Sequence, residues 1–96
     1  MDQMAEKRYQ ASKDYICREI AGESVLVPVA DRAGNMMVTL NETSAFLWKQ
    51  FELPVTAEDV ILRTKQEYED ADGLLEQHVR DFINESVTTG YIWEVL

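Results

Sequence analysis

The spacing of apolar residues changes along this chain, from strand-like runs in the first half to a helical repeat in the second. Residues 15–20 and 25–29 are rich in β-branched and aromatic side chains and flank a turn with glycine and serine, which is typical of a β-hairpin. Residues 36–40 form a third short apolar run after a second polar turn. Together these segments predict a three-stranded antiparallel sheet.

Three helical segments follow the predicted strands. Asn41 is a preferred N-cap residue, and the apolar helix that starts behind it has to stop before Pro54. Thr56 is placed to cap a second helix. Apolar residues then recur with a helical period over residues 73–89, and Gly90 is placed to end this helix. The predicted fold class is therefore α+β and winged-helix-like, a three-stranded antiparallel sheet followed by a three-helix bundle.

The two ends of the chain differ in pattern. Residues 1–14 are polar and lack sustained periodicity, so we expect a flexible N-terminal arm, with a short helix around residues 5–11 as the alternative. Residues 91–96 are too apolar to be loose and predict a terminal strand or an extended segment packed on the core. The folded domain is expected to span residues 15–96.

Composition and charge narrow the range of functions. The chain has 96 residues, enough for one domain, with 18 acidic against 9 basic side chains and a net charge of −9. This charge opposes binding to phosphates, so neither nucleic acid nor an anionic membrane is expected as a partner. No apolar run is long enough to span a bilayer, the first residues do not resemble a secretory signal, and the single Cys17 suits a reducing compartment. We expect a cytoplasmic protein.

No group of residues has the pattern of a catalytic or metal site. The single histidine, His78, has no second histidine or cysteine at metal-ligand spacing and is far in sequence from Cys17. The segment Asp70–Gly73 lacks most of the ligands of a calcium loop. A glycine-rich phosphate loop is also missing. We therefore expect a protein without enzymatic activity, cofactor or bound metal.

A winged helix often reads DNA with its third helix, so the charges of that helix matter. The predicted third helix carries Glu76, Asp81 and Glu85 against Arg80. Because phosphates would repel this helix, its charge pattern does not favour DNA binding.

Three segments, in this order and spacing, resemble the PqqD family. They are Leu40–Trp48 (LNETSAFLW), Thr56–Val60 (TAEDV) leading to Tyr68, and Val79–Ile83 running to Thr89–Ile92. The likeness covers roughly residues 15–95, and the family takes its name from a pyrroloquinoline quinone biosynthesis protein. The resemblance implies a small three-stranded sheet packed on three helices, with no chemistry of its own.

What the resemblance implies about partners is specific. Members of the family bind the leader segment of ribosomally made precursor peptides and present it to a modifying enzyme, often a radical S-adenosylmethionine enzyme. The leader adds as a further strand beside the third strand and leans on the third helix. Carried over to this chain, the strand edge comprises Met36, Met37, Val38, Thr39 and Leu40, and the helix wall comprises Leu74, Gln77, His78, Asp81 and Glu85.

The physical chemistry of an open strand edge agrees with such a use. Its amide and carbonyl groups can bind a peptide backbone in register, and the flexible Met36 and Met37 can adapt to different apolar side chains. The acidic helix would favour basic residues in the leader. A competing hypothesis is a structural or regulatory interaction module that binds no leader and is homodimeric through this edge. The chain's own N-terminal arm is a further candidate to cover it.

Overall fold

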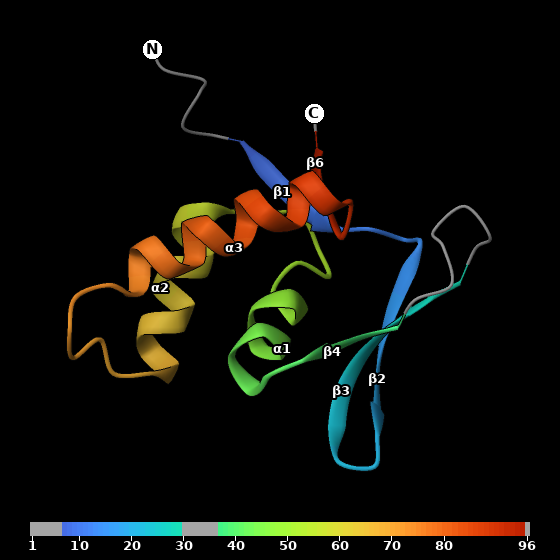
Figure 1. Ribbon diagram of the computed structural model, residues 1–96. Helices are drawn as coiled ribbons and strands as arrows, with labels where there is room; N and C mark the ends of the chain where they lie inside the picture. Colours follow the sequence, from blue (N-terminus) through green and yellow to red (C-terminus); the bar gives the residue numbers. More distant parts are fainter. Residues whose placement is uncertain (1–6, 30–36, 96) are drawn as a thin grey trace.

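Two small antiparallel sheets and three helices make up the part of the chain that the computed structural model describes, residues 7–29 and 37–95 (Figure 1). The strands are β1 (Arg8–Ala11), β2 (Tyr15–Ile20), β3 (Glu23–Pro28), β4 (Val38–Leu40), β5 (Val55–Thr56) and β6 (Ile92–Val95), and the helices are α1 (Glu42–Lys49), α2 (Ala57–Glu67) and α3 (Leu75–Thr89). We call β2–β3–β4 the hairpin sheet and β5–β1–β6 the terminal sheet.

The hairpin sheet confirms the three strands expected from the sequence. β2 pairs antiparallel with β3, with Tyr15 opposite Pro28, and β3 pairs antiparallel with β4, with Leu26 opposite Val38. β3 ends at Pro28, which has no amide hydrogen to continue the ladder. Met36, the first residue of the predicted third strand, lies outside the described residues.

Both predicted helix N-caps are present. The Asn41 side chain accepts a hydrogen bond of 2.7 Å from the Ser44 amide and starts α1 directly after β4. Thr56 accepts a hydrogen bond of 3.1 Å from the Asp59 amide at the start of α2. Because Asn41 is the single residue between β4 and α1, its cap fixes the direction of the strand relative to the helices.

α3 begins slightly later than the sequence predicts, because the loop before it is held by its own side chains. Asp70 accepts a hydrogen bond of 3.0 Å from the Leu75 amide, and Asp72 accepts one of 3.2 Å from the Leu74 amide. Gly90 ends the helix as predicted, in the left-handed conformation with a φ of 89°.

The terminal sheet joins the two ends of the described chain to its middle. β1 pairs antiparallel with both β5 and β6, so that Tyr9 lies opposite Val55 on one side and Glu94 on the other. Figure 1 shows β1 and β6 side by side, although they lie near opposite ends of the sequence. β6 confirms the terminal strand that the sequence predicts over residues 91–96.

The N-terminal segment corrects an expectation. The predicted lack of regular structure over residues 1–14 is wrong for Arg8–Ala11, which forms β1, and the alternative helix around residues 5–11 is wrong for the same residues. Residues 1–6 lie outside the described part. The pattern missed this strand because its partners lie in distant segments, so no local periodicity marks it.

The core lies where the sheets and helices meet, and α1 lies between the hairpin sheet and the other two helices (Figure 1). Its largest fully buried side chains are Leu26, Phe51, Val60, Val79 and Ile92. Trp48 of α1 belongs to the same cluster, and its Nε1 is buried without a hydrogen-bond partner in the described chain. Such a donor costs about 1–3 kcal/mol, so the packing around α1 has to offset this cost.

Candidate functional site

β4 forms an edge of the hairpin sheet. Among the strands that the structure describes, Val38–Leu40 pairs with β3 alone. Outside this ladder, these residues make no backbone hydrogen bond within residues 7–29 and 37–95. Alternate N–H and C=O groups of β4 therefore point away from the sheet and are available to another strand.

The side chains of β4 alternate between the two faces of the sheet. Val38 and Leu40 are half-buried and pack against the core, whereas Thr39 is exposed. Met37, just before the strand, has 58% of its surface exposed and shares the face of Thr39. None of these side chains is charged, so the edge lacks the charges with which many exposed strands prevent pairing.

One flank of α3 packs against α2. Its core-facing side consists of Leu75, Val79, Ile83 and Ser86, all of them buried. Beside this stripe, Arg80 Nη2 lies 3.4 Å from Glu58 Oε2 of α2. The hydrogen bond of 3.2 Å that Arg80 Nε donates to Glu76 raises the pKa of the guanidinium, and Glu58 raises it further against the opposing effect of burial. This flank is therefore closed to a peptide.

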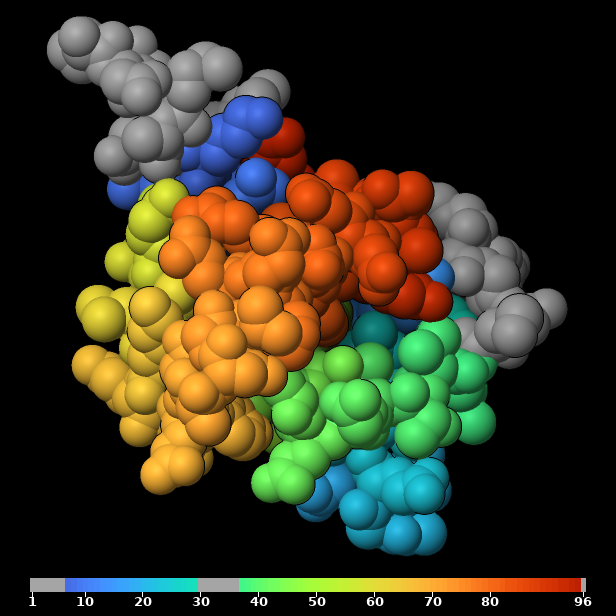
Figure 2. Space-filling model, turned by 60° about the vertical axis from the view of Figure 1, so that its left-hand side comes forward, coloured from blue at the N-terminus to red at the C-terminus, as the bar shows by residue number. Residues whose placement is uncertain are grey.

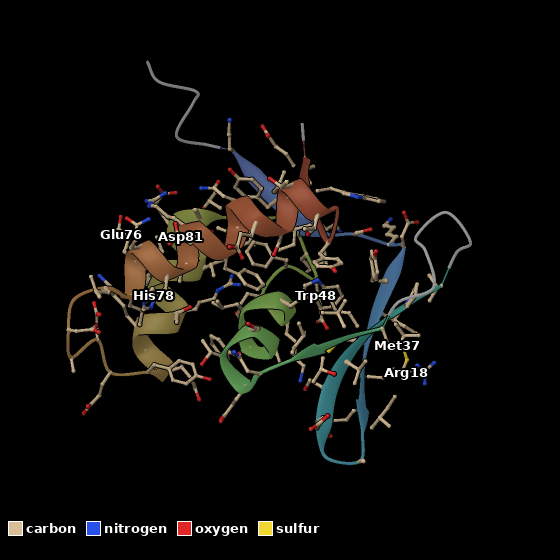
Figure 3. All side chains as sticks on the ribbon, viewed as in Figure 1. Arg18, Met37, Trp48, Glu76, His78 and Asp81 are labelled. Atoms are coloured by element: carbon tan, nitrogen blue, oxygen red, sulfur yellow. The ribbon has the colours of Figure 1, made fainter. Side chains whose placement is uncertain are left out.

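The opposite flank of α3 carries His78, Phe82 and Glu85. Phe82 is half-buried, and its ring stacks on that of Phe51 with the centroids 6.4 Å apart. His78 borders the same hollow as Thr43 of α1, and Figure 3 shows it on the side of α3 that faces α1. This second flank therefore faces the segment that runs from β4 into α1.

A groove separates β4 from this flank of α3. Figure 2 shows the surface hollowed between the C-terminal half of α3, in orange-red, and the green segment of β4 and α1. Towards the N-terminus of α3 lies a hollow of about 280 Å³, whose lining includes Thr43, Leu47, Tyr68, Leu75, His78 and Val79 together with Glu69, Asp70 and Asp72. Apolar walls with acidic neighbours suit a peptide that carries both apolar and basic side chains.

A larger hollow of about 850 Å³ lies between the β2–β3 turn, the β4–α1 junction and the end of α2. Phe46 and Tyr68 contribute aromatic rings that meet edge to face at 5.4 Å. Its charged lining residues are Glu19, Glu23, Glu42, Lys49 and Glu67. The end of β4 is thus surrounded by predominantly negative surface.

The residues of the predicted helix wall lie on two different sides of α3. His78 and Glu85 lie on the flank that faces α1 and β4, whereas Gln77 and Asp81 lie opposite the buried stripe and are hydrogen-bonded to each other at 2.9 Å. Figure 3 shows Asp81 on this outer side of α3. Leu74 precedes the helix and is 49% exposed.

Sequence reasoning missed two residues of the groove. Phe82 belongs to the apolar helical period of residues 73–89, but it is only half-buried and lies between His78 and Glu85 on the flank. Thr43 lies in the segment that resembles the PqqD family, and it borders the smaller hollow. A helical wheel that marked the two flanks separately would have placed Phe82 in this position.

Neither a metal-binding cluster nor a membrane-spanning helix occurs among the described residues. Within residues 7–29 and 37–95, no three histidine, cysteine, aspartate or glutamate side chains are grouped so that they could hold a metal ion. In the same part of the chain, every helix is too short or too polar to cross a lipid bilayer.

Comparisons with known proteins identify a matching family and a solved structure with a similar fold. Residues 23–94 match the family described as Coenzyme PQQ synthesis protein D (PqqD). No curated protein sequence matches the chain. Among solved structures, TbiB1 in complex with the TbiA(beta) leader peptide has a similar fold, with a TM-score of 0.69 and 18% sequence identity over 86% of this chain and 93% of that chain.

Proposed function

Because this chain belongs to the PqqD family, we propose that it is a non-catalytic, cytoplasmic adaptor for a ribosomally made precursor peptide. It binds the leader segment as an added strand along β4 and presents the precursor to a modifying enzyme of the radical S-adenosylmethionine class. The observation that carries the proposal is the open, uncharged edge of β4 beside the free flank of α3. The fold shared with TbiB1, which was solved with a leader peptide, supports it.

The binding site comprises the strand edge and one flank of α3. On the edge we assign Met36, Met37, Val38, Thr39 and Leu40, and on the flank His78, Phe82 and Glu85. Gln77 and Asp81 are left out because they lie on the outward face of the helix. A leader therefore contacts the protein through backbone on one side and through side chains on the other.

Two contributions to affinity follow from this arrangement. Each hydrogen bond between the leader and β4 contributes a net of about 0.5–1.5 kcal/mol, and the short β4 can make few of them. Side chains of the leader that point into the groove, towards Phe82 and His78, have to supply the rest. The alternate side chains lie next to Met37 and Thr39 on the other face of the sheet.

The charge around the groove selects among leaders. Glu85 lies on the flank of α3, and Asp70 and Asp72 border the hollow towards its N-terminus. Together with the net charge of −9, these carboxylates favour a leader with basic residues near its apolar anchors.

The direct test uses the precursor peptide encoded beside this gene. Its leader is titrated into the purified protein by calorimetry, with a scrambled leader of the same composition as the control. The modifying enzyme encoded in the same place is then assayed on the full precursor with and without this protein. We expect saturable binding of the leader alone, none of the scrambled peptide, and modification that depends on the adaptor.

Two results would contradict the proposal. One is modification of the precursor at the same rate in the absence of this protein. The other is a stable homodimer, seen by sedimentation, that is closed through β4 and does not bind the leader, which would favour the interaction-module hypothesis.

A further inference from the structure

The hairpin sheet has a second face, turned away from the helices. Alternation along the paired strands puts Cys17, Leu26 and Val38 on the core side. The opposite face carries the apolar residues Ile16, Ile20, Val25, Val27 and Met37 together with the polar residues Arg18, Glu23 and Thr39. Figure 1 shows the described helices on the other side of this sheet, and Figure 3 shows Arg18 and Met37 pointing away from them.

Apolar side chains are exposed at two corners of this outer face. Ile20 is 47% exposed and Met37 58% exposed, and they lie diagonally on either side of Val25, which is 6% exposed. Val25 is buried but does not belong to the core cluster. Exposed apolar side chains gathered on one face mark an interaction site more often than isolated ones do.

Arg18 gives the outer face a defined charge. Its side chain is exposed and makes no hydrogen bond or ion pair with another described residue. The chain as a whole carries a net charge of −9, yet the centre of this face holds a cation, and Glu23 is the other charged residue of the face, beside Ile20. A partner that fits here has an apolar patch and a carboxylate opposite Arg18.

We propose that this outer face is the docking surface for the modifying enzyme, an inference that rests on the proposed function. A leader strand on β4 becomes the fourth strand of the hairpin sheet. Its alternate side chains then lie beside Met37 and Thr39 and extend the same face. The enzyme therefore meets a surface built jointly by the adaptor and the peptide, and it binds the complex with the leader more tightly than the free adaptor.

The size of the face decides between this occupant and a second copy of the chain. β2 and β3 are six residues long and β4 three, so at about 3.3 Å per residue and about 4.8 Å between strands the face covers roughly 240 Å². A stable dimer buries about 800 Å² on each partner. The outer face alone is too small for that, whereas it suits a transient contact that is completed by the bound peptide.

Two substitutions on β2 test the docking surface. Arg18→Glu reverses the charge and Ile20→Glu places a charge on the apolar patch, and both positions are separated from β4 by β3. We expect leader affinity to be unchanged, because neither residue belongs to the groove. The KM of the modifying enzyme for the adaptor–precursor complex should rise about tenfold or more, which is the size expected for loss of a central interface contact, with kcat unchanged.

Matched controls lie on α2. Arg63→Glu and Leu62→Glu make the same chemical changes at exposed positions, with Leu62 59% exposed, and they should leave the KM as it is. Leader affinity also reports on folding, and Arg18→Gln serves as a milder variant if Arg18→Glu does not fold.

The outcomes separate the two proposals. If the wild-type protein does not bind the leader, the proposed function fails and this inference fails with it. If the leader binds but the β2 variants behave like the α2 controls, only the docking surface is wrong. A wild-type dimer that Arg18→Glu dissociates would assign the face to a second copy and also overturn the inference.

Discussion

The two sheets of this small protein are built from different parts of the chain and differ in what they expose. The hairpin sheet forms from three segments that are consecutive in sequence and exposes one edge and one face. The terminal sheet joins segments from both ends and the middle of the chain, and it buries Ala11, Val55 and Ile92. The two ends of the chain are thus paired in the terminal sheet, whereas the proposed recognition of a partner lies at the open edge of the hairpin sheet, whose Leu26 also belongs to the core. Mutations that disrupt the terminal pairing should therefore leave recognition intact.

The physical reason lies in the cost of bringing distant segments together. Pairing the two ends of a chain loses more conformational entropy than closing a hairpin. Burial of apolar side chains such as Ile92, which is fully buried, offsets this loss. β4 is held by its pairing with β3, by the Asn41 cap and by the partial burial of Val38 and Leu40 on one face, and none of these contacts uses its outer edge.

The largest expected effect comes from breaking the terminal sheet. Ile92→Ala should lower the free energy of unfolding by about 2–5 kcal/mol, because it leaves a cavity in the core. Urea denaturation measures this change, and calorimetry on the folded fraction should show an unchanged affinity for the leader. Ile20→Ala in the hairpin sheet is the control, and it should cost much less. Equal losses from both substitutions would contradict the division between the sheets.

The next effect comes from the backbone of the leader. A strand added to β4 donates alternate amides to the protein, so N-methylation of single leader residues should weaken binding with a period of two. Each methyl group on an inward amide should raise the Kd by up to about tenfold. Methylation of the leader residues whose amides point away from β4 is the internal control, and it should leave the Kd unchanged. A loss without this period would argue against strand addition.

A smaller effect distinguishes the faces of α3. Glu85→Lys places a positive charge on the flank of the groove and should weaken a basic leader by about two- to fivefold. Asp81→Lys makes the same charge change on the outward face of the same helix and should have no effect. The two Kd values, measured at the same ionic strength, test this directly. Equal changes would show that only net charge matters.

The smallest effect concerns the flank of α3 that faces α2. Arg80→Gln removes the ion pairs with Glu58 and Glu76, which are exposed and contribute about 0.2–1 kcal/mol to stability. Thermal unfolding should show this modest loss, and the leader affinity should not change. A clear loss of affinity would mean that the peptide also contacts the α2 side.

The sequence predicts the hairpin sheet and the helix boundaries well because their signals are local. The caps at Asn41 and Thr56 and the left-handed Gly90 depend on neighbouring backbone alone. β1 gives no such signal, since Arg8–Ala11 becomes a strand only through pairing with β5 and β6. Local patterns cannot report on partners at the other end of the chain.

For the candidate site, too, local features are indicated by the sequence, whereas features that depend on packing between distant segments are not. That β4 forms an edge depends on strand order within one hairpin and the next turn, which the sequence indicates, whereas its use for binding is implied by the family resemblance and stays a prediction. The two sides of the predicted helix wall differ, because His78 borders a hollow beside Thr43 of α1 whereas Asp81 lies on the outward face of α3. This difference depends on how α3 packs against its neighbours, which a helical period alone does not give.

In the proposed complex, a leader peptide adds to the edge of β4. The most direct measurement is a two-dimensional NMR titration of the ¹⁵N-labelled protein with the leader. We predict that the amides of Val38–Leu40 and of the flank at His78, Phe82 and Glu85 shift together, while those of Arg8–Ala11 stay in place. Shifts confined to the terminal sheet, or none at saturating peptide, would contradict the account.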